Sequence, residues 1–287
     1  MSSMATARKS WGDAPWQLWW SQLGAIFQIE IKKAIWMRRS IWIYLVAFGP
    51  TFLIALHAIV DRASQDVGIQ IDTEMMASIF QVYYLRLGIF FGCLGLFTWL
   101  FRGEVVEKSL HYYFLSPMRR EVLVLGKFVA GVAASTVIFG TSVLLSFVFM
   151  YGHYGAAGRA YVYHGPGLGQ LMAYLGVTVL ACIGYGSVFM ALSLVFKNPI
   201  LPGVFMLLWE TFHAVLPSWL QKLSITFYLK QLSPVTLAPD GIMALFTVVA
   251  EPVPAWLAVG GLLCLSVAIL LLARILIRRM EISYLAD

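Results

Sequence analysis

Two ionisable residues, Glu210 and His213, lie inside the apolar segment LLWETFHAVL. Their spacing of three places both side chains on one face of a helix. There a carboxylate and an imidazole can form a structural hydrogen bond, line a polar pathway, or bind a cation and take part in catalysis. Two ligands are too few to define a metal site, and the pair is accompanied by neither an HExxH pattern nor a second histidine–carboxylate set. All three interpretations stay open at the level of sequence.

A second group of charged residues lies in Phe101–Lys127, FRGEVVEKSLHYYFLSPMRREVLVLGK, between two long apolar segments. On a helix, the polar residues share one face and the apolar residues share another. The polar set is Glu104, Glu107, Lys108 and His111, and the apolar set is Val106, Leu110, Tyr113 and Phe114. This segment is too short and too charged to cross a bilayer, so the pattern predicts a helix lying along the membrane surface.

Ser116-Pro117 ends this surface helix, because the residue before a proline is displaced from helical geometry. Ser116 can then cap a new helix that has Pro117 in its first position. A helix from Pro117 to about Tyr151 is longer than one membrane thickness. We therefore expect its first turns, which carry Arg119 and Arg120, to project beyond the bilayer.

The composition predicts an all-α polytopic membrane protein. Of the 287 residues, 60% are hydrophobic and 12% are charged, and the mean hydropathy is +0.81. A transmembrane helix needs about 20 predominantly apolar residues. We place six such segments near 41–60, 79–101, 122–151, 169–196, 200–216 and 256–277. The fourth and fifth are treated as separate because 169–216 is far too long for one crossing.

The distribution of Lys and Arg predicts the orientation, because these residues accumulate in cytoplasmic loops. With both termini inside, the cytoplasmic segments hold Arg8, Lys9, Lys32, Lys33, Arg38, Arg39, Arg102, Lys108, Arg119, Arg120, Lys127, Lys197, Arg274, Arg278 and Arg279. Outside are Arg62, Arg159, Lys222 and Lys230. The net charge of +6 then reflects membrane orientation and not nucleic-acid binding. Arg86 and His57 lie inside predicted segments, and we expect both to extend toward the external interface.

Two further stretches do not span the membrane: one precedes the predicted membrane domain of residues 41–287, and the other lies within that domain. Residues 1–40 form a cytoplasmic tail whose Trp16, Trp19 and Trp20 recur with helical spacing, which is typical of an interfacial helix in contact with lipid. The external segment of about 217–255 contains apolar runs too short to span, which predicts short re-entrant helices before the last span. Its aromatic residues are either pathway residues or interfacial anchors; they are Trp219, Phe227 and Tyr228.

The charged segment resembles the membrane permeases of ATP-binding-cassette (ABC) transporters of the type-2 exporter class. Permeases of this class have a glutamate-containing amphipathic helix after the second span, an apolar stretch ending in Ser/Thr-Pro, a nearby basic residue and a lysine in the third span. The matching residues here are Glu104, Glu107, Leu110, Leu115, Ser116, Pro117, Arg119 or Arg120, Gly126 and Lys127. The six spans, the interfacial helix and the external segment extend the resemblance over most of the chain.

The resemblance implies that residues of about 103–116 form a coupling helix that binds a separate ATPase subunit. The coupling residues would be Glu104, Glu107, Lys108, His111, Tyr112, Ser116, Pro117, Arg119 and Arg120. The sequence has no phosphate-binding loop, since its glycine-rich stretch Gly165–Gly169 is followed by Gln170. We thus expect no cofactor in this chain, and ATP and Mg²⁺ in two partner ATPases. A second permease copy, as a homodimer or close homologue, would complete the transporter.

The leading hypothesis is therefore a permease subunit, not itself an enzyme, of an ATP-driven exporter in a prokaryotic inner membrane. One alternative is an intramembrane enzyme that depends on a metal or a proton and uses Glu210 and His213. Another is a membrane scaffold without transport activity. The sequence does not identify a substrate.

Overall fold

The computed structural model describes residues 16–36, 40–64, 68–104, 115, 119–196, 198–235 and 253–279, all of which are helical or connect helices. Five helices are long and apolar enough to cross a membrane. Four of them are α2 (Ile41–Ser64), α7 (Arg120–Gly152), α9 (Gly167–Val195) and α14 (Ala255–Arg279). The fifth is one continuous helix that consists of α3 (Ile69–Ser78), η3 (Ile79–Gly88), α4 (Ile89–Thr98) and η4 (Trp99–Gly103). The prediction of an all-helical chain with several spanning helices is confirmed.

The predicted fifth span, 200–216, is different in the structure. Its helix α10 (Ile200–Phe212) has only 13 residues, so it is about 20 Å long against a hydrocarbon core of about 30 Å. A 3₁₀ turn, η5 (His213–Val215), follows at once, and the chain becomes extended at Leu216. Pro217 then precedes the four-residue helix α11 (Ser218–Gln221). Hydropathy alone did not reveal this interruption, because the residues of the turn are largely apolar.

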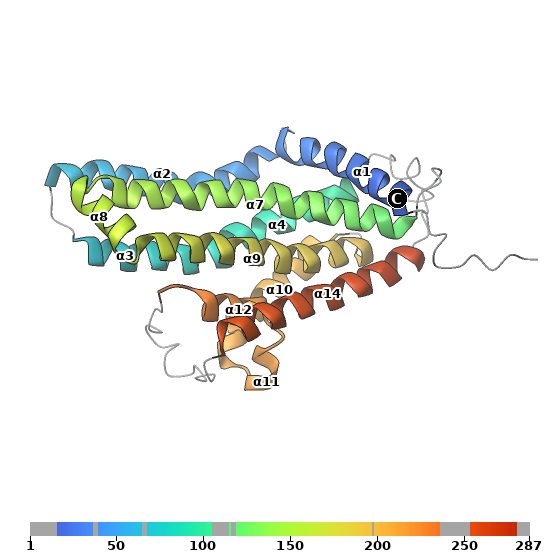
Figure 1. Cartoon of the computed structure of the whole chain (residues 1–287). Coiled ribbons are helices and arrows are strands. Elements are labelled where there is room, and N and C mark those ends of the chain that lie inside the picture. The colour runs from blue at the N-terminus through green and yellow to red at the C-terminus, as the bar shows by residue number, and fades with distance from the viewer. Residues whose placement is uncertain are drawn as a thin grey trace, which may run out of the picture.

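Helix α7 is the central element of the bundle, and it packs against α1 (Trp16–Trp36), α2, α4 and α9. Helix α9 in turn packs against α4 and α14. In Figure 1 the long helices run side by side, with α1 and the last turns of α14 at one end and α8 (Ala156–His164) and α3 at the other. We call these the α1 end and the α8 end.

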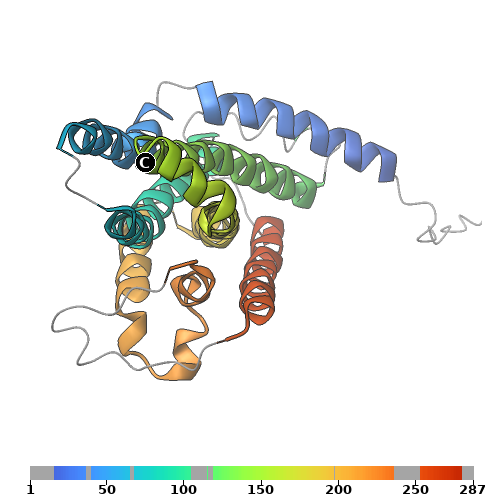
Figure 2. The ribbon, with the colours of Figure 1, turned by 60° about the vertical axis from the view of Figure 1, so that its left-hand side comes forward.

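Helix α1 lies along the outside of α7 near the α1 end (Figure 2). Its buried residues, Ile26, Glu30 and Ala34, recur every four positions and so form one stripe along the helix. A side chain at Gly126 of α7 would lie 2.8 Å from Ile26 Cγ2, so this glycine allows the two helices to approach closely. The predicted N-terminal helix is therefore present, and it is joined to the bundle along one face.

The short helices α10, α11 and α12 (Ile225–Leu232) gather on the opposite side of the bundle, next to α14 (Figure 2). They lie partway along the bundle and not at either end (Figure 1). Short external re-entrant helices were predicted between the fifth segment and the last span, and the structure has the short helices α11 and α12 in this part of the chain. Residues 236–252, the remainder of the predicted external segment, lie outside the described residues.

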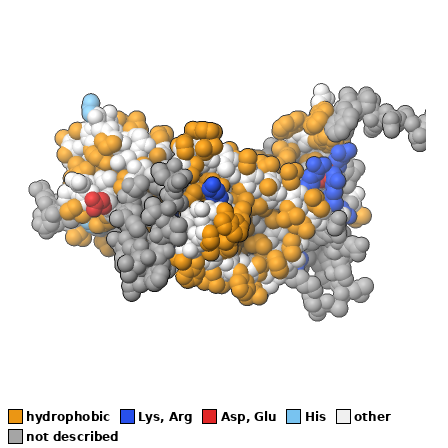
Figure 3. Space-filling model, turned by 90° about the horizontal axis from the view of Figure 1, so that it is seen from below, with side chains coloured by type: hydrophobic (Ala, Val, Ile, Leu, Met, Phe, Trp, Pro, Cys, Tyr) orange, Lys and Arg blue, Asp and Glu red, His pale blue; other side chains and the backbone are white. Residues whose placement is uncertain are grey.

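Much of the surface of the bundle is apolar, as the face in Figure 3 shows. On α14 the exposed apolar side chains follow the whole length of the helix and include Trp256, Val267 and Ile275. Contiguous apolar surface of this extent is typical of contact with lipid or with another protein. The interior is aromatic as well, with Phe90 packed edge-on against Tyr185 and Phe189.

Candidate coupling site and membrane-embedded polar residues

The candidate coupling site is a buried cluster of charges at the α1 end, centred on Lys127 of α7. Its ammonium group lies 2.8 Å from Glu30 Oε1 and 2.9 Å from Glu104 Oε2. It also donates a hydrogen bond of 2.9 Å to the carbonyl oxygen of Leu100. Lys33 completes the cluster, 3.1 Å from Glu104 Oε1. Two lysines and two glutamates thus balance each other's charge, and three of the four side chains are buried, while Lys33 is partly exposed.

Three separate elements supply these side chains. Glu30 belongs to the buried stripe of α1, Glu104 directly follows η4 at the end of the second long helix, and Lys127 lies near the start of α7. Burial, opposed by the positive charge of Lys127, raises the pKa of Glu30. Because a buried charge is costly without its partner, the cluster holds the three elements in one fixed relation.

Glu104 does not occupy the exposed position that the sequence predicted. Its side chain was expected on a polar helix face with Glu107, yet it is only 5% exposed and points into the cluster. The reason is long-range: Lys127 and Lys33 offer it two cations that local spacing does not reveal. Six other predicted coupling residues lie outside the described residues, namely Glu107, Lys108, His111, Tyr112, Ser116 and Pro117.

The two predicted coupling arginines mark the start of α7. Arg119 is exposed, with its guanidinium 4.5 Å from the centre of the Trp19 ring, which is a favourable cation–π distance. Arg120 donates a hydrogen bond of 3.4 Å to the carbonyl oxygen of Ile277 in α14. The neighbouring Glu121 pairs with Arg274 and Arg278 of the same helix. The start of α7 therefore contacts both α1 and the end of α14.

Glu210, the first candidate for intramembrane chemistry, caps the N-terminus of α12. Its carboxylate accepts hydrogen bonds from Ser224 Oγ at 2.7 Å, from the Ile225 amide at 3.1 Å and from the Thr226 amide at 2.8 Å. The side chain is buried, with 1% exposed. A carboxylate is favoured at a helix N-terminus, where free amides and the helix dipole both stabilise negative charge. Of the interpretations left open by the sequence, structural hydrogen bonding best fits this geometry.

His213 and the three aromatic candidates do not converge with Glu210 on one cavity. His213 Nδ1 lies 2.7 Å from the carbonyl oxygen of Glu210, not from its carboxylate. Trp219 is 67% exposed, whereas Phe227 is 5% exposed and packs inside. Tyr228 donates a hydrogen bond to the Lys222 carbonyl oxygen. Within the described part of the chain, no group of three or more His, Cys, Asp or Glu residues has an arrangement able to hold a metal ion.

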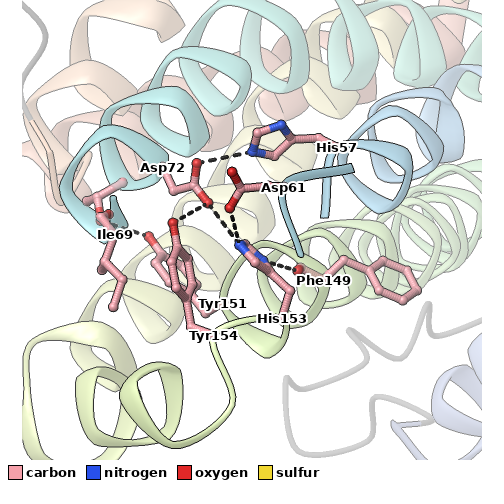
Figure 4. A network of polar contacts seen from close by, with 9 residues as sticks. His57, Asp61, Ile69, Asp72, Phe149, Tyr151, His153 and Tyr154 are labelled. Atoms are coloured by element: carbon pink, nitrogen blue, oxygen red, sulfur yellow. Dashed lines mark hydrogen bonds and ion pairs between the residues drawn. The ribbon is translucent and has the colours of Figure 1, made fainter. Parts of the chain in front are cut away.

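A second polar network, missed by the sequence analysis, lies at the α8 end (Figure 4). His153 Nε2 is 3.0 Å from Asp61 and 3.8 Å from Asp72. Asp72 Oδ1 lies 3.2 Å from His57 Nε2, and Asp72 Oδ2 accepts a hydrogen bond of 3.2 Å from the Tyr154 hydroxyl. His57 was expected to extend toward the interface, but the structure pairs it with Asp72. The network joins α2, α3 and the end of α7, so it fixes the α8 end much as the Lys127 cluster fixes the α1 end.

These networks were missed because their members are far apart in the sequence. Glu30 and Lys127 are separated by 97 positions, and Asp61 and His153 by 92. The one local signal was the basic residue in the third span, which the resemblance singled out as Lys127. Comparison with known proteins adds no assignment: no family model matches the sequence, and no curated protein matches it significantly.

Proposed function

We propose that the chain is the transmembrane permease subunit of an ATP-driven exporter of the ABC type-2 class, powered by separate ATPase subunits. The observation that carries the proposal is the Lys127 cluster, which lies where the charged segment leaves the second long helix. A segment that receives force needs a rigid connection to the helices it moves. The pairs of Lys127 with Glu104 and Glu30 supply such a connection to α7 and α1.

In this mechanism the α1 end faces the cytoplasm. Residues of about 103–116 form the coupling segment, and Glu107, Lys108, His111 and Tyr112 contact the ATPase. Movement of this segment displaces the end of the second helix, and Glu104 transmits the displacement through Lys127 to α7. Because α7 has 33 residues and packs against α1, α2, α4 and α9, its motion reaches the whole bundle. Two copies of the chain and two ATPases form the complete transporter.

The six-segment topology of the proposal counts α10, together with η5, α11 and α12, as the fifth membrane segment. These short helices lie partway along the bundle (Figure 1). They fit a membrane-embedded segment that enters and leaves on one side, in which buried backbone groups find partners within the protein. The three hydrogen bonds to the Glu210 carboxylate supply such partners at the start of α12.

The enzyme alternative has less support, because Glu210 already accepts three hydrogen bonds and His213 faces a backbone carbonyl. A general base needs an oxygen or nitrogen free to approach a substrate. No contact in the described part of the chain favours the scaffold alternative.

Co-purification tests the proposal. The tagged chain is expressed in its native host and purified in mild detergent, and ATPases in the eluate are identified by mass spectrometry. We expect an ABC ATPase with the wild type and with the control Glu74→Lys, which reverses an exposed acid in α3. Glu107→Lys should lose the ATPase, because it reverses a charge on the predicted contact face. Absence of any ABC ATPase from the wild-type eluate would contradict the proposal.

A further inference from the structure

Arg86 occupies an unusual place for a charged residue. It stands in η3, in the middle of the 35-residue helix Ile69–Gly103. It was expected to extend toward the external interface, and the helix continues for about 25 Å on either side of it. An arginine at such depth is expensive unless an anion, water or a paired side chain compensates it.

No side chain in the described part of the chain compensates Arg86, which has neither a hydrogen bond nor an ion pair there. The acid most suited by position, Glu210, is already engaged by the hydroxyl of Ser224 and the amides of Ile225 and Thr226. His213 cannot be the counterion either, because an imidazole is neutral or positive and never carries a negative charge. The positive charge of Arg86 therefore has no counterion from these residues.

A second cation, Lys230, stands exposed on α12, the short helix that packs against η3. Helix α12 packs against η3, and Gln81 Nε2 donates a hydrogen bond of 2.7 Å to the carbonyl oxygen of Val235. Arg86 follows Gln81 by five residues and Lys230 precedes Val235 by five, so each stands within a few residues of this contact. The positive charge of Arg86 acts electrostatically on Lys230. Lys230 likewise has no ion pair in the described residues.

The geometry points to an anion-binding site formed by Arg86 and Lys230, and the group that fits it is a phosphate. A guanidinium binds two phosphate oxygens at once, while an ammonium adds a second positive charge from another direction. Two neighbouring cations repel each other, and an anion between them converts this repulsion into attraction. The phosphate belongs either to a lipid headgroup or to a free anion.

The surroundings favour an amphiphilic ligand. Helix α10 leads into His213, packs against α4, and exposes Phe205, Leu208 and Phe212 on its outer surface. An exposed apolar helix that leads toward α12, together with a pair of cations, matches a molecule with a phosphate and a hydrocarbon part. As a substrate site this assignment rests on the proposed function, whereas phosphate binding itself requires no ATPase.

The test measures binding to the purified chain without any partner. Nanodiscs that contain phosphatidylglycerol in phosphatidylcholine test the lipid source by native mass spectrometry of retained lipid. Inorganic phosphate, titrated into protein in neutral detergent, tests the free-anion source through the melting temperature. The variants are Arg86→Gln, Lys230→Gln and the charge-preserving Arg86→Lys, with Lys222→Gln as control for an exposed lysine in the same region.

We expect the wild type and Lys222→Gln to bind at least one of the two probes, and Arg86→Gln and Lys230→Gln to bind it about tenfold more weakly. Arg86→Lys should retain most of the binding. In neutral detergent without phosphate, Arg86→Gln should melt at the same or a higher temperature than the wild type, because it removes an uncompensated charge. That second measurement also shows whether the variant is folded.

Two outcomes would overturn the assignment. One is equal binding of both probes by the wild type and the two glutamine variants. The other is a lower melting temperature for Arg86→Gln than for the wild type in neutral detergent, together with an equal decrease for Asp240→Asn or Glu251→Gln. Such a result would mean that Arg86 pairs with an acidic residue of this chain. Loss of ATPase co-purification with intact phosphate binding would instead refute the permease proposal alone.

Discussion

At the residue scale, Lys127 links more of the molecule than any other charged side chain in the α1-end cluster. Replacing it by methionine keeps the length of the side chain but removes the buried cation between Glu30 and Glu104, and only the partly exposed Lys33 remains to pair with them. Breaking a buried ion pair by removing one partner costs about 3 kcal/mol or more. We therefore expect Lys127→Met to lower the melting temperature in detergent markedly. The exposed Lys32→Met on α1 serves as the control and should melt like the wild type.

Glu210 allows a second prediction at this scale. In Glu210→Gln an NH₂ group, a hydrogen-bond donor, replaces one carboxylate oxygen. It then faces the Ser224 hydroxyl and the amides of α12, which are also donors, so no acceptor is left for them there. Leaving a buried donor unpaired costs about 2 kcal/mol, so the variant should be less stable and its α12 more accessible to hydrogen exchange. Stability and exchange equal to the wild type would show that the cap is dispensable. The enzyme alternative makes no prediction for exchange in α12.

At the element scale, the joint between α1 and α7 depends on close approach at Gly126. Leucine at this position would collide with Ile26, since even its Cβ atom would lie 2.8 Å from Ile26 Cγ2. Over-packing costs about 1–3 kcal/mol, and it also separates Glu30 from Lys127. The control is Gly140→Leu on the same helix, where nothing lies within 4 Å of an added Cβ.

We expect Gly126→Leu, but not Gly140→Leu, to release α1 from α7. Limited proteolysis should then cleave α1 earlier, and the melting temperature should fall. If both leucine variants resist proteolysis equally, α1 is not held by this contact. Such a result would also weaken the view that the Lys127 cluster is a rigid joint.

At the scale of the whole molecule, the sequence predicted what depends on local composition. Long apolar runs define spanning helices regardless of their neighbours, so all five long helices were anticipated. The predicted fifth segment, 200–216, was misjudged because hydropathy counts apolar residues and does not detect the turn at 213–216. The placement of Glu104, Glu210 and Arg86 could not be predicted, because each is decided by partners from elsewhere in the chain, or by their absence.

The central claim, that this chain receives force from a separate ATPase, is tested most directly by ATPase stimulation. The chain and its co-purified ATPase are reconstituted together in proteoliposomes, and ATP hydrolysis is compared with that of the ATPase alone. The account predicts stimulation by the wild type and by Glu74→Lys, and loss of stimulation with Glu107→Lys and with Lys127→Met variants that still insert into the membrane. Equal hydrolysis with and without the wild-type chain, or full stimulation by Glu107→Lys and Lys127→Met, would contradict it.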